Sequence, residues 1–265
     1  MAEVSAAPVF GKALVIITGA SKGFGRALAL SIAPLLSEGS VLLLAARSED
    51  RLRELERELS LTGTGLTVRC VTADLASKAG VERVLSAVTD SARDPLLQRL
   101  MLFNNAGSLG DVSRFLRDFS DVDEVSSYLT LNVSSAVCVT AGVLQAVRLR
   151  PLRRVVVNLS SLCALRPFPS WGLYCSGKAA RDMLFRVLAE EEPELRVLNY
   201  APGPLDTDMQ LQARSFSADA DLKNSFSEMH DKGQLLTCAQ SISKLLQVLQ
   251  DDTFASGAHL DYYDL

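Results

Sequence analysis

Short apolar runs, bounded by turn-forming residues, recur along the chain and indicate its architecture. Runs of this length without polar alternation are typical of strands that are buried on both faces of a parallel sheet. We therefore predict strands over Ala13–Ile17, Val41–Ala46, Leu66–Thr72, Leu100–Phe103, Arg154–Asn158, Arg196–Tyr200 and Ala258–Tyr262.

Stretches with helical periodicity lie between these runs. In Glu49–Leu59, three leucines fall on one face and two acidic residues open the segment, where they favour the positive end of a helix. Pro34 interrupts the first helical pattern and should bend or end it. The alternation of strands and helices predicts a doubly wound (Rossmann-type) α/β fold, with a parallel sheet of about seven strands covered by helices on both faces.

The pattern favours a single domain. The 265 residues contain no internal repeat and no Gly/Ser-rich linker, so we predict a tail over residues 1–10 and one domain over residues 11–265. Within that domain, Pro202–Leu235 has scattered charges and few apolar positions. We expect an irregular loop region on the substrate side there, because long segments of that kind commonly serve as lids.

Charge and the lengths of the apolar runs exclude several classes of function. Lys and Arg number 27 against 31 Asp and Glu, and the net charge of -4 provides no positive field for nucleic acid or an anionic membrane. The apolar runs fall far short of the roughly 18 residues of a membrane-spanning helix. The first ten residues do not resemble a secretory signal, so we expect a soluble, cytoplasmic protein.

Cysteine and histidine usage supports the same expectation. The five cysteines are odd in number, lie far apart and form no C-x-x-C pair, which favours a reducing compartment over a disulfide framework. With two histidines and no acidic cluster at metal-ligand spacing, we expect no metal site.

A glycine-rich turn follows the first predicted strand. After Thr18 the chain reads Gly19, Ala20, Ser21, Lys22, Gly23, Phe24 and Gly25, and a helical pattern starts at Arg26. Glycines let the backbone turn sharply and approach a ligand, and the free N–H groups at a helix N-terminus attract phosphate. The motif predicts a dinucleotide site; the alternative is a tight turn between strand and helix with no ligand.

The end of the second predicted strand indicates which dinucleotide binds. An acidic residue there favours NAD, whereas an arginine accommodates the 2′-phosphate of NADP. Arg47 stands at this position and Lys22 is a second possible cation, so we predict NADP(H). The alternative is that Arg47 is a solvated residue opening the next helix. Asp74 and Leu75, after the third strand, lie where we expect the adenine edge of the cofactor.

Tyr174 and Lys178 carry the candidate chemistry. They are four residues apart in a helical pattern that runs to about Glu191, so their side chains share one face. A lysine cation about 4 Å from a phenol is expected to lower the phenol pKa by roughly three units. Ser160 and Ser161 end the fifth strand and bring a hydroxyl toward the same substrate oxygen. An exposed helical pair without function is the alternative for a Tyr-x-x-x-Lys spacing alone.

These motifs occur together in the order and spacing of the short-chain dehydrogenase/reductase family, which the chain resembles from about Gly11 to its end. They are Thr18-Gly-x-x-x-Gly-x-Gly25, Asn104-Asn-Ala-Gly107, Asn132, Ser161, Tyr174-x-x-x-Lys178 and Pro202-Gly203. Within the family the chain is most similar to members that reduce pterins, through segments that include Asn105–Ser113, Ser160–Leu165, Gly177–Phe185, Val197–Met209 and Ser256–Asp261.

The resemblance implies a role for each motif residue. Tyr174 would donate a proton, and Lys178 would be its electrostatic partner and a ligand of the nicotinamide ribose. Ser161 would orient the substrate carbonyl, and Asn132 would hold a water that connects Lys178 to solvent. Cofactor contacts are implied for Gly19, Ser21, Lys22, Gly23, Phe24, Gly25, Arg47, Ser48, Asp74, Leu75, Asn105, Lys178, Leu205, Thr207 and Met209. Substrate contacts are implied for Ser160, Ser161, Tyr174, Gly203 and Asp261.

For the whole protein, the resemblance implies NADPH-dependent reduction of the keto side chain of pterins, as in the last step of tetrahydrobiopterin biosynthesis. Asp261 would bind the amino and ring N–H groups of the pterin. A homodimer through the helices before and after the fifth strand is also implied. One alternative is a general reductase of diketones, quinones or steroids; another, of a different class, is an NADP(H)-sensing module without catalysis. The intact Ser161, Tyr174 and Lys178 argue against the second.

Overall fold

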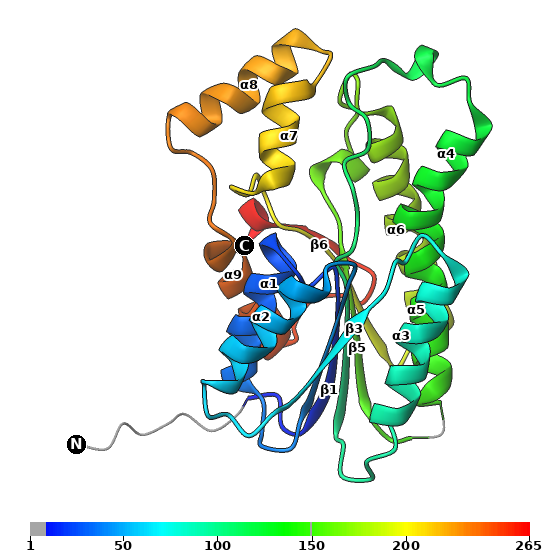
Figure 1. The fold of residues 1–265 in the computed structure, drawn as a ribbon, viewed down its shortest axis with the longest axis vertical. Helices are drawn as coiled ribbons and strands as arrows, with labels where there is room; N and C mark the ends of the chain where they lie inside the picture. Colours follow the sequence, from blue (N-terminus) through cyan, green and yellow to red (C-terminus); the bar gives the residue numbers. More distant parts are fainter. Residues whose placement is uncertain (1–8, 149) are drawn as a thin grey trace.

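The computed structural model describes residues 9–148 and 150–265, which form a parallel sheet between two layers of helices (Figure 1). The strands are β1 (Ala13–Thr18), β2 (Val41–Ala46), β3 (Thr67–Thr72), β4 (Arg99–Asn104), β5 (Arg153–Leu159), β6 (Leu195–Ala201) and β7 (His259–Asp261). Their order in the sheet is β3-β2-β1-β4-β5-β6-β7, and every pairing is parallel. The strand order reverses between β1 and β4, where sheets of this kind bind ligands.

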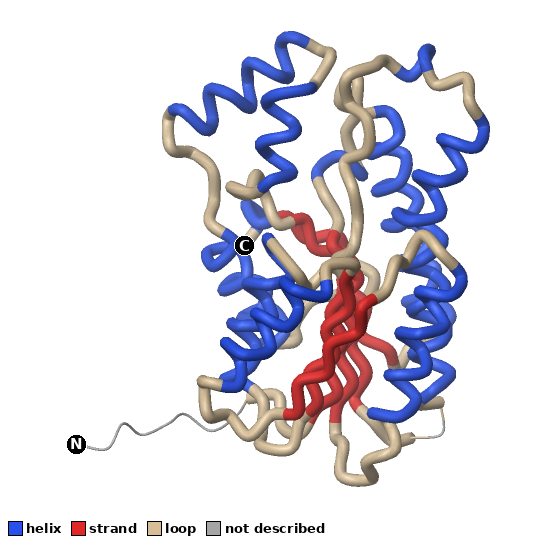
Figure 2. Tube along the Cα trace, viewed as in Figure 1, coloured by secondary structure: helices blue, strands red, loops and turns tan. Residues whose placement is uncertain are grey.

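Helices cover both faces of this sheet (Figure 2). They are α1 (Gly23–Ile32), α2 (Glu49–Ser60), α3 (Lys78–Ser91), α4 (Val122–Leu129), α5 (Ser135–Ala146), α6 (Gly172–Glu191), α7 (Asp208–Phe216), α8 (Ala220–Asp231) and α9 (Cys238–Asp251). The apolar faces of α1, α2 and α9 pack on one side of the sheet, and those of α3, α5 and α6 pack on the other. The predicted doubly wound α/β fold is confirmed.

The boundaries of the first elements agree with the sequence pattern except at the predicted tail. Helix α1 ends at Ile32, and Pro34 lies in the 3-10 turn Ala33–Leu35, as predicted. Phe10, which the sequence analysis assigns to the tail, is instead buried in the core, and its N–H donates to the carbonyl of Leu35. The packed domain therefore begins before residue 11; residues 1–8 lie outside the described residues.

The prediction of an irregular stretch over Pro202–Leu235 is wrong. This segment contains α7 and α8, which pack against each other above the sheet (Figure 1). The Asp219 carboxylate caps α8 by accepting a hydrogen bond from the N–H of Leu222 at 2.9 Å. Leu222 and Phe226 are one helical turn apart and pack on a small apolar cluster, so two apolar positions suffice to dock the helix.

One stretch is long and apolar enough to match a membrane helix by composition. Val122–Ala146 is a continuous run through α4, a π-helical turn at Thr130–Ser134, and α5. In α5, Ala136, Val139 and Val143 are buried against the sheet. Core packing therefore accounts for the apolar residues of α5, whereas α4 buries no residue.

Candidate active site

The glycine-rich turn after β1 is shaped to receive a phosphate group. Gly19 has φ +68° and Gly23 has φ +54°, a region that other residues rarely adopt. A Cβ on Gly25 would lie 2.4 Å from the carbonyl oxygen of Gly19, so the start of α1 packs directly on the turn. Among the described residues no side chain caps α1, and its first turn holds no acidic residue. Its N–H groups and positive end are therefore available to a pyrophosphate.

Thr18 and Asn105 hold this turn against the end of β4. The hydroxyl of Thr18 accepts hydrogen bonds from the N–H groups of Asn105 at 3.1 Å and Ala106 at 3.0 Å. The side-chain amide of Asn105 donates to the carbonyls of Thr18 at 2.8 Å and Gly19 at 3.1 Å. Asn105, predicted as a cofactor contact, thus uses its amide N–H groups to hold the turn in place.

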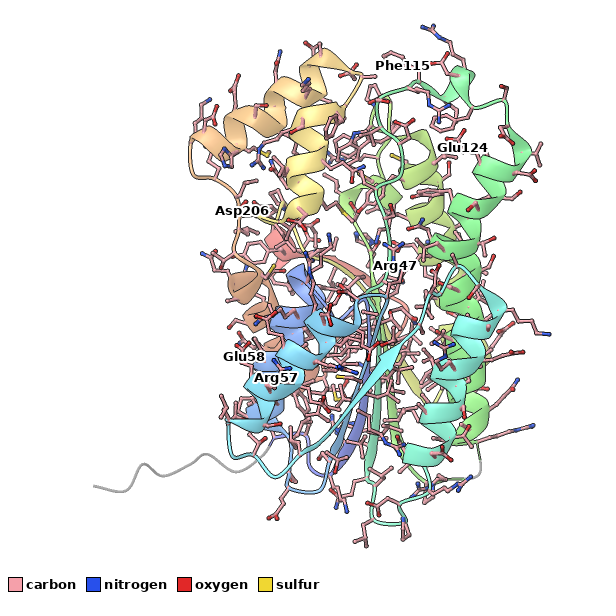
Figure 3. All side chains as sticks on the ribbon, in the orientation of Figure 1. Arg47, Arg57, Glu58, Phe115, Glu124 and Asp206 are labelled. Atoms are coloured by element: carbon pink, nitrogen blue, oxygen red, sulfur yellow. The ribbon has the colours of Figure 1, made fainter. Side chains whose placement is uncertain are left out.

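The predicted 2′-phosphate side presents an exposed arginine, Arg47. Arg47 follows β2, is exposed, and makes no ion pair with any residue in the described ranges. In Figure 3, Arg47 lies nearer to α7 and α8 than Arg57 does, because Arg57 is farther along α2. Lys22, the second predicted cation, is 2.8 Å from the Asp208 carboxylate at the start of α7. An exposed pair of this kind is weak, so Lys22 remains able to exchange its partner.

The other residues predicted on this side have unequal access. Ser48 is the N-cap of α2 and makes no side-chain capping bond within the described part of the chain. Asp74 is exposed after β3, whereas Leu75 is packed in the core. Leu75 can therefore offer a ligand only its backbone.

Tyr174 and Lys178 lie together on α6, beneath the carboxyl ends of β4 and β5. Tyr174 is 8% exposed, and the Lys178 ammonium group lies 5.5 Å from the centre of its ring. Lys178 also donates a hydrogen bond to the carbonyl of Leu159 at the end of β5. Ser161 follows that strand, and its hydroxyl accepts a hydrogen bond from the N–H of Cys163 at 3.2 Å. The structure thus brings the predicted tyrosine, lysine and serine into one site.

Burial dominates the proton affinities in this site. It raises the pKa of Tyr174, with further contributions from the nearby Cys163 and Cys175 thiols, while Ser161 and Arg181 partly offset the rise. The predicted lowering of the phenol pKa by Lys178 is therefore wrong, since burial raises this pKa instead. The reason is that the lysine itself is desolvated: burial, aided by the charge of Arg181, lowers the pKa of Lys178 to about 7.

Two further predicted residues have internal partners. The side-chain carbonyl of Asn132 accepts a hydrogen bond from the N–H of Ser108 at 2.8 Å, and its amide donates to the carbonyl of Tyr128 at 2.9 Å. Asn132 sits in the π-helical turn between α4 and α5, a feature frequent at functional sites. Ser160 is buried, and its hydroxyl donates to the Asp182 carboxylate at 2.5 Å. Its predicted substrate contact would require the hydroxyl to leave that partner.

The remaining predicted residues border the site from β6, α7 and the C-terminus. Gly203 has φ +77°, and a Cβ there would lie 2.8 Å from Leu236. Leu205 forms a parallel bridge with Leu236, and Thr207 is the N-cap of α7. Met209 reaches the catalytic side, with its sulfur 4.0 Å from the phenol oxygen of Tyr174.

Asp261 ends β7 and is half-buried. One carboxylate oxygen accepts a hydrogen bond from the N–H of Tyr263 at 3.0 Å, which caps the 3-10 turn Tyr262–Asp264. A carboxylate has two oxygens with about four acceptor positions, so this bond leaves acceptor capacity for a ligand.

An aromatic cluster forms a wall above Tyr174. The Trp171 ring meets the Tyr174 ring edge-on, with centres 5.6 Å apart, and stacks on Phe226 of α8 at 5.1 Å. The Trp171 indole N–H donates to the hydroxyl of Ser217, which follows α7, at 2.9 Å. The α7–α8 unit is thereby fixed to the residue that immediately precedes the catalytic helix.

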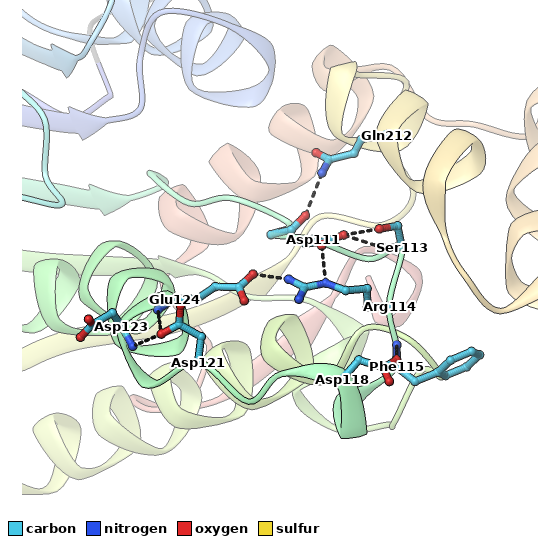
Figure 4. A network of polar contacts seen from close by, with 10 residues as sticks. Asp111, Ser113, Arg114, Phe115, Asp118, Asp121, Asp123, Glu124 and Gln212 are labelled. Atoms are coloured by element: carbon cyan, nitrogen blue, oxygen red, sulfur yellow. Dashed lines mark hydrogen bonds and ion pairs between the residues drawn. The ribbon is translucent and has the colours of Figure 1, made fainter.

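The loop after β4 is tied both internally and to α7 (Figure 4). The Asp111 carboxylate accepts hydrogen bonds from the Ser113 hydroxyl at 2.6 Å and the Arg114 guanidinium at 2.7 Å, and Arg114 also pairs with Glu124 of α4. The side-chain amide of Gln212 in α7 donates to the carbonyl of Gly110 at 2.8 Å. Two segments about a hundred residues apart in sequence therefore enclose one side of the site.

A buried polar network, which the sequence pattern does not predict, lies under the site. Asp182 accepts hydrogen bonds from Asn158 at 3.1 Å and from Ser160, and it pairs with His259 of β7 at 2.5 Å. Arg181, directly before it, is 1% exposed. Positions 174, 178 and 181 follow helical spacing, and this pattern was the available signal that Arg181 faces the same site.

Metal binding is the last feature to test. Within residues 9–148 and 150–265, no group of three or more His, Cys, Asp or Glu side chains is arranged to hold a metal ion. A metal-free site remains a prediction.

The chain resembles known proteins over nearly its whole length. The family model for short chain dehydrogenase matches residues 13–218. Sepiapterin reductase of Rattus norvegicus is 54% identical over 256 residues, which cover 96% of this chain and 98% of that protein. Sepiapterin reductase of Xenopus tropicalis is 49% identical over 262 residues, covering 98% of this chain and 100% of that protein.

A solved structure shares the architecture. The structure of L-sorbose reductase from Gluconobacter frateurii, complexed with NADPH and L-sorbose, has a TM-score of 0.78 and 26% identity, and the match covers 96% of this chain and 95% of that one. Fold, motif order and family model agree. The chain therefore belongs to the short-chain dehydrogenase family.

Proposed function

We propose that this protein reduces the keto side chain of pterins with NADPH, as sepiapterin reductases do. The observation that carries the proposal is the 54% identity to rat sepiapterin reductase across 96% of the chain. The glycine turn, the uncapped N-terminus of α1 and the exposed Arg47 suit a dinucleotide with a 2′-phosphate. The product would be the alcohol formed in the last step of tetrahydrobiopterin biosynthesis.

The proposed mechanism assigns one task to each catalytic side chain. NADPH, when bound, supplies a hydride to the carbonyl carbon of the substrate. Tyr174, whose phenol is protonated at neutral pH, donates its proton to the carbonyl oxygen as negative charge develops there. Ser161 donates a hydrogen bond that orients the carbonyl. Lys178 stabilises the resulting phenolate and binds the nicotinamide ribose, and a water on Asn132 resupplies the proton.

The substrate test compares a pterin with simple diketones. We expect kcat/KM for sepiapterin with NADPH to exceed that for small diketones, because only the pterin offers paired N–H donors to a carboxylate. A preference for the diketones would make the protein a general carbonyl reductase. NADPH binding without turnover of any carbonyl would make it a sensing module.

Asp261 is the proposed pterin anchor. It is half-buried, and the single bond to the Tyr263 N–H leaves acceptor positions unused. Asp261→Ala should raise KM for sepiapterin while sparing small diketones, and Asp251→Ala, which removes an exposed carboxylate at the end of α9, provides the control. An equal effect of Asp261→Ala on both substrates would remove the anchoring role.

We also propose a homodimer assembled through α5 and α6. These helices expose apolar side chains at Val137, Met183, Leu184 and Val187. Exposed apolar groups on adjacent helices are typical of an association surface. Light scattering of the purified protein should give twice the 28.6 kDa chain mass, and Leu184→Glu should shift it toward the monomer.

A cytoplasmic location fits the thiol chemistry. All five cysteines are free, and Cys163 and Cys175 are near enough to affect each other's pKa, yet they form no disulfide. Reduced thiols at such short range are typical of a reducing compartment. Fractionation of the producing cells should place the activity in the cytoplasm.

A further inference from the structure

Arg181 is a buried cation held by backbone carbonyls. Its Nε donates to the side-chain oxygen of Asn158 at 2.7 Å. One terminal nitrogen, Nη1, donates to the carbonyl of Ala106 at 3.1 Å and to that of Asn132 at 3.4 Å. The other, Nη2, donates to the carbonyl of Asn104 at 2.5 Å. The guanidinium therefore joins the end of β4, the following loop, the π-helical turn and β5.

Stability alone does not account for a charge in this position. Removing a cation from water is costly, and apolar replacements of buried ionic groups are often neutral or stabilising. The carboxylate of Asp182 does not contact the guanidinium directly; Asn158 stands between them, bonded to both. The charge of Arg181 is thus incompletely neutralised where Lys178 and Tyr174 lie, three and seven residues earlier on the same helix.

Several ionisable groups face this charge from the elements packed around it. Tyr174, Cys175, Lys178 and Asp182 are on α6, Tyr128 is on α4, Cys163 is in the turn after β5, and His259 of β7 pairs with Asp182. Arg181 lowers the pKa of Lys178 and of Tyr174, whereas Asp182 raises the pKa of Lys178. The two adjacent residues therefore act on Lys178 with opposite sign.

We propose that Arg181 is a positioning residue for carbonyl reduction, which clamps the backbone of Asn104, Ala106 and Asn132 around the site and holds a permanent positive charge beside Lys178. The inference rests on the proposed function of Tyr174 and Lys178. The clamp fixes the chain segments that border the reacting groups, and the charge sets the pH at which Lys178 loses its proton. Asp182 is the counter-charge that limits this effect.

The test is the pH dependence of kcat/KM for sepiapterin reduction by three variants. Arg181→Met removes the charge and should move the alkaline limb of the profile to a higher pH, by about one unit. Asp182→Asn removes the counter-charge with little change in side-chain shape and should move the alkaline limb to a lower pH. Arg181→Lys keeps the charge but cannot reach three carbonyls; its limb should stay at the wild-type pH while kcat falls about tenfold or more.

The signs of these shifts separate electrostatics from structural damage. Damage to the fold lowers the rate at every pH without moving the limb in opposite directions. If the alkaline limb of the kcat/KM profile lies at the wild-type pH in both Arg181→Met and Asp182→Asn, the proposal is overturned. If Arg181→Met does not fold, judged by its circular dichroism and NADPH binding, Asp182→Asn and Arg181→Lys still decide the matter. Failure of the proposed function is a distinct result, because the wild-type protein would then not reduce sepiapterin.

Discussion

At the scale of single residues, Tyr174 and Lys178 are one helical turn apart; Tyr174 is buried and Lys178 is half-buried. The spacing in the sequence suggests an attraction that lowers the phenol pKa, but the folded chain desolvates both partners. Burial raises the pKa of Tyr174 and lowers the pKa of Lys178 to about 7. A phenol that keeps its proton at neutral pH is suited to act as an acid on a developing alkoxide.

Tyr174→Phe tests this role directly. The variant loses the donated proton but keeps the ring that packs edge-on against Trp171, so the fold and NADPH binding should be retained. We expect turnover of sepiapterin to fall by about 10²–10⁴-fold, the usual worth of a positioned acid. Steady-state kinetics and NADPH fluorescence titration measure the two effects separately. Near-normal turnover would show that another group protonates the product.

Arg47 is the residue that should select the cofactor. It is exposed without an ion-pair partner in the described ranges, and a charge-assisted bond to a 2′-phosphate is worth about 1.5–3 kcal/mol. Arg47→Asp should therefore lower the preference for NADPH over NADH by about ten- to a hundredfold in kcat/KM. Arg57→Asp makes the same charge change farther along α2 and should leave the ratio unchanged. If the ratio of kcat/KM with NADPH to kcat/KM with NADH is the same in Arg47→Asp as in Arg57→Asp, Arg47 does not contact the phosphate.

At the scale of elements, burial decides which segments the sequence reveals. Strands β1, β2 and β4 are buried on both faces, so their apolar runs are nearly uninterrupted and easily read. The apolar pattern does not reveal helices α7 and α8 in the same way, because α7 fully buries one apolar residue, Ala213, and α8 fully buries none. What orders them is the packing of Ala213, Leu222 and Phe226 in the apolar cluster that contains Trp171. Trp171 lies some forty to fifty-five residues earlier, so local periodicity does not reveal this packing.

The stacking of Phe226 on Trp171 should hold α8 in place. Removing the ring takes away a stacked pair worth about 0.5–1.5 kcal/mol beyond its buried area, which should loosen the α7–α8 unit over the site. We expect Phe226→Ala to raise KM for sepiapterin and to speed limited proteolysis within Asp208–Asp231. Phe216→Ala, in the same unit but largely exposed, is the control and should change neither. Equal cleavage rates for both variants would contradict the docking role.

At the scale of the whole molecule, the site exists only because distant segments meet at one edge of the sheet. Motif order in the sequence locates the glycine turn, Ser161, Tyr174 and Lys178, since each follows a recognisable strand or lies on a periodic helix. It does not reveal that Asn105 braces Gly19, or that Arg181 reaches the carbonyl of Asn104, because these contacts join residues more than seventy positions apart. Their partners are backbone atoms, which leave no pattern of residue types.

Binding of NADPH should stabilise this assembly as a unit, because the cofactor would contact the glycine turn, Arg47 and Lys178 on different elements. A ligand at 100 times its Kd that binds only the folded state adds about 2.7 kcal/mol. For a domain of this size, that corresponds to a rise in Tm of about 5–10 °C. Thermal unfolding monitored by circular dichroism, with and without cofactor, measures the shift.

The comparison between cofactors makes this measurement specific to the proposed binding mode. At equal concentrations, NADH should stabilise the wild-type protein less than NADPH does, because it lacks the 2′-phosphate that Arg47 would bind. In Arg47→Asp the two shifts should converge, while Tyr174→Phe should keep the wild-type difference, since its altered group lies at the nicotinamide end. Equal shifts from both cofactors in the wild-type protein would mean that Arg47 does not contact the phosphate, even if the enzyme turns over NADPH.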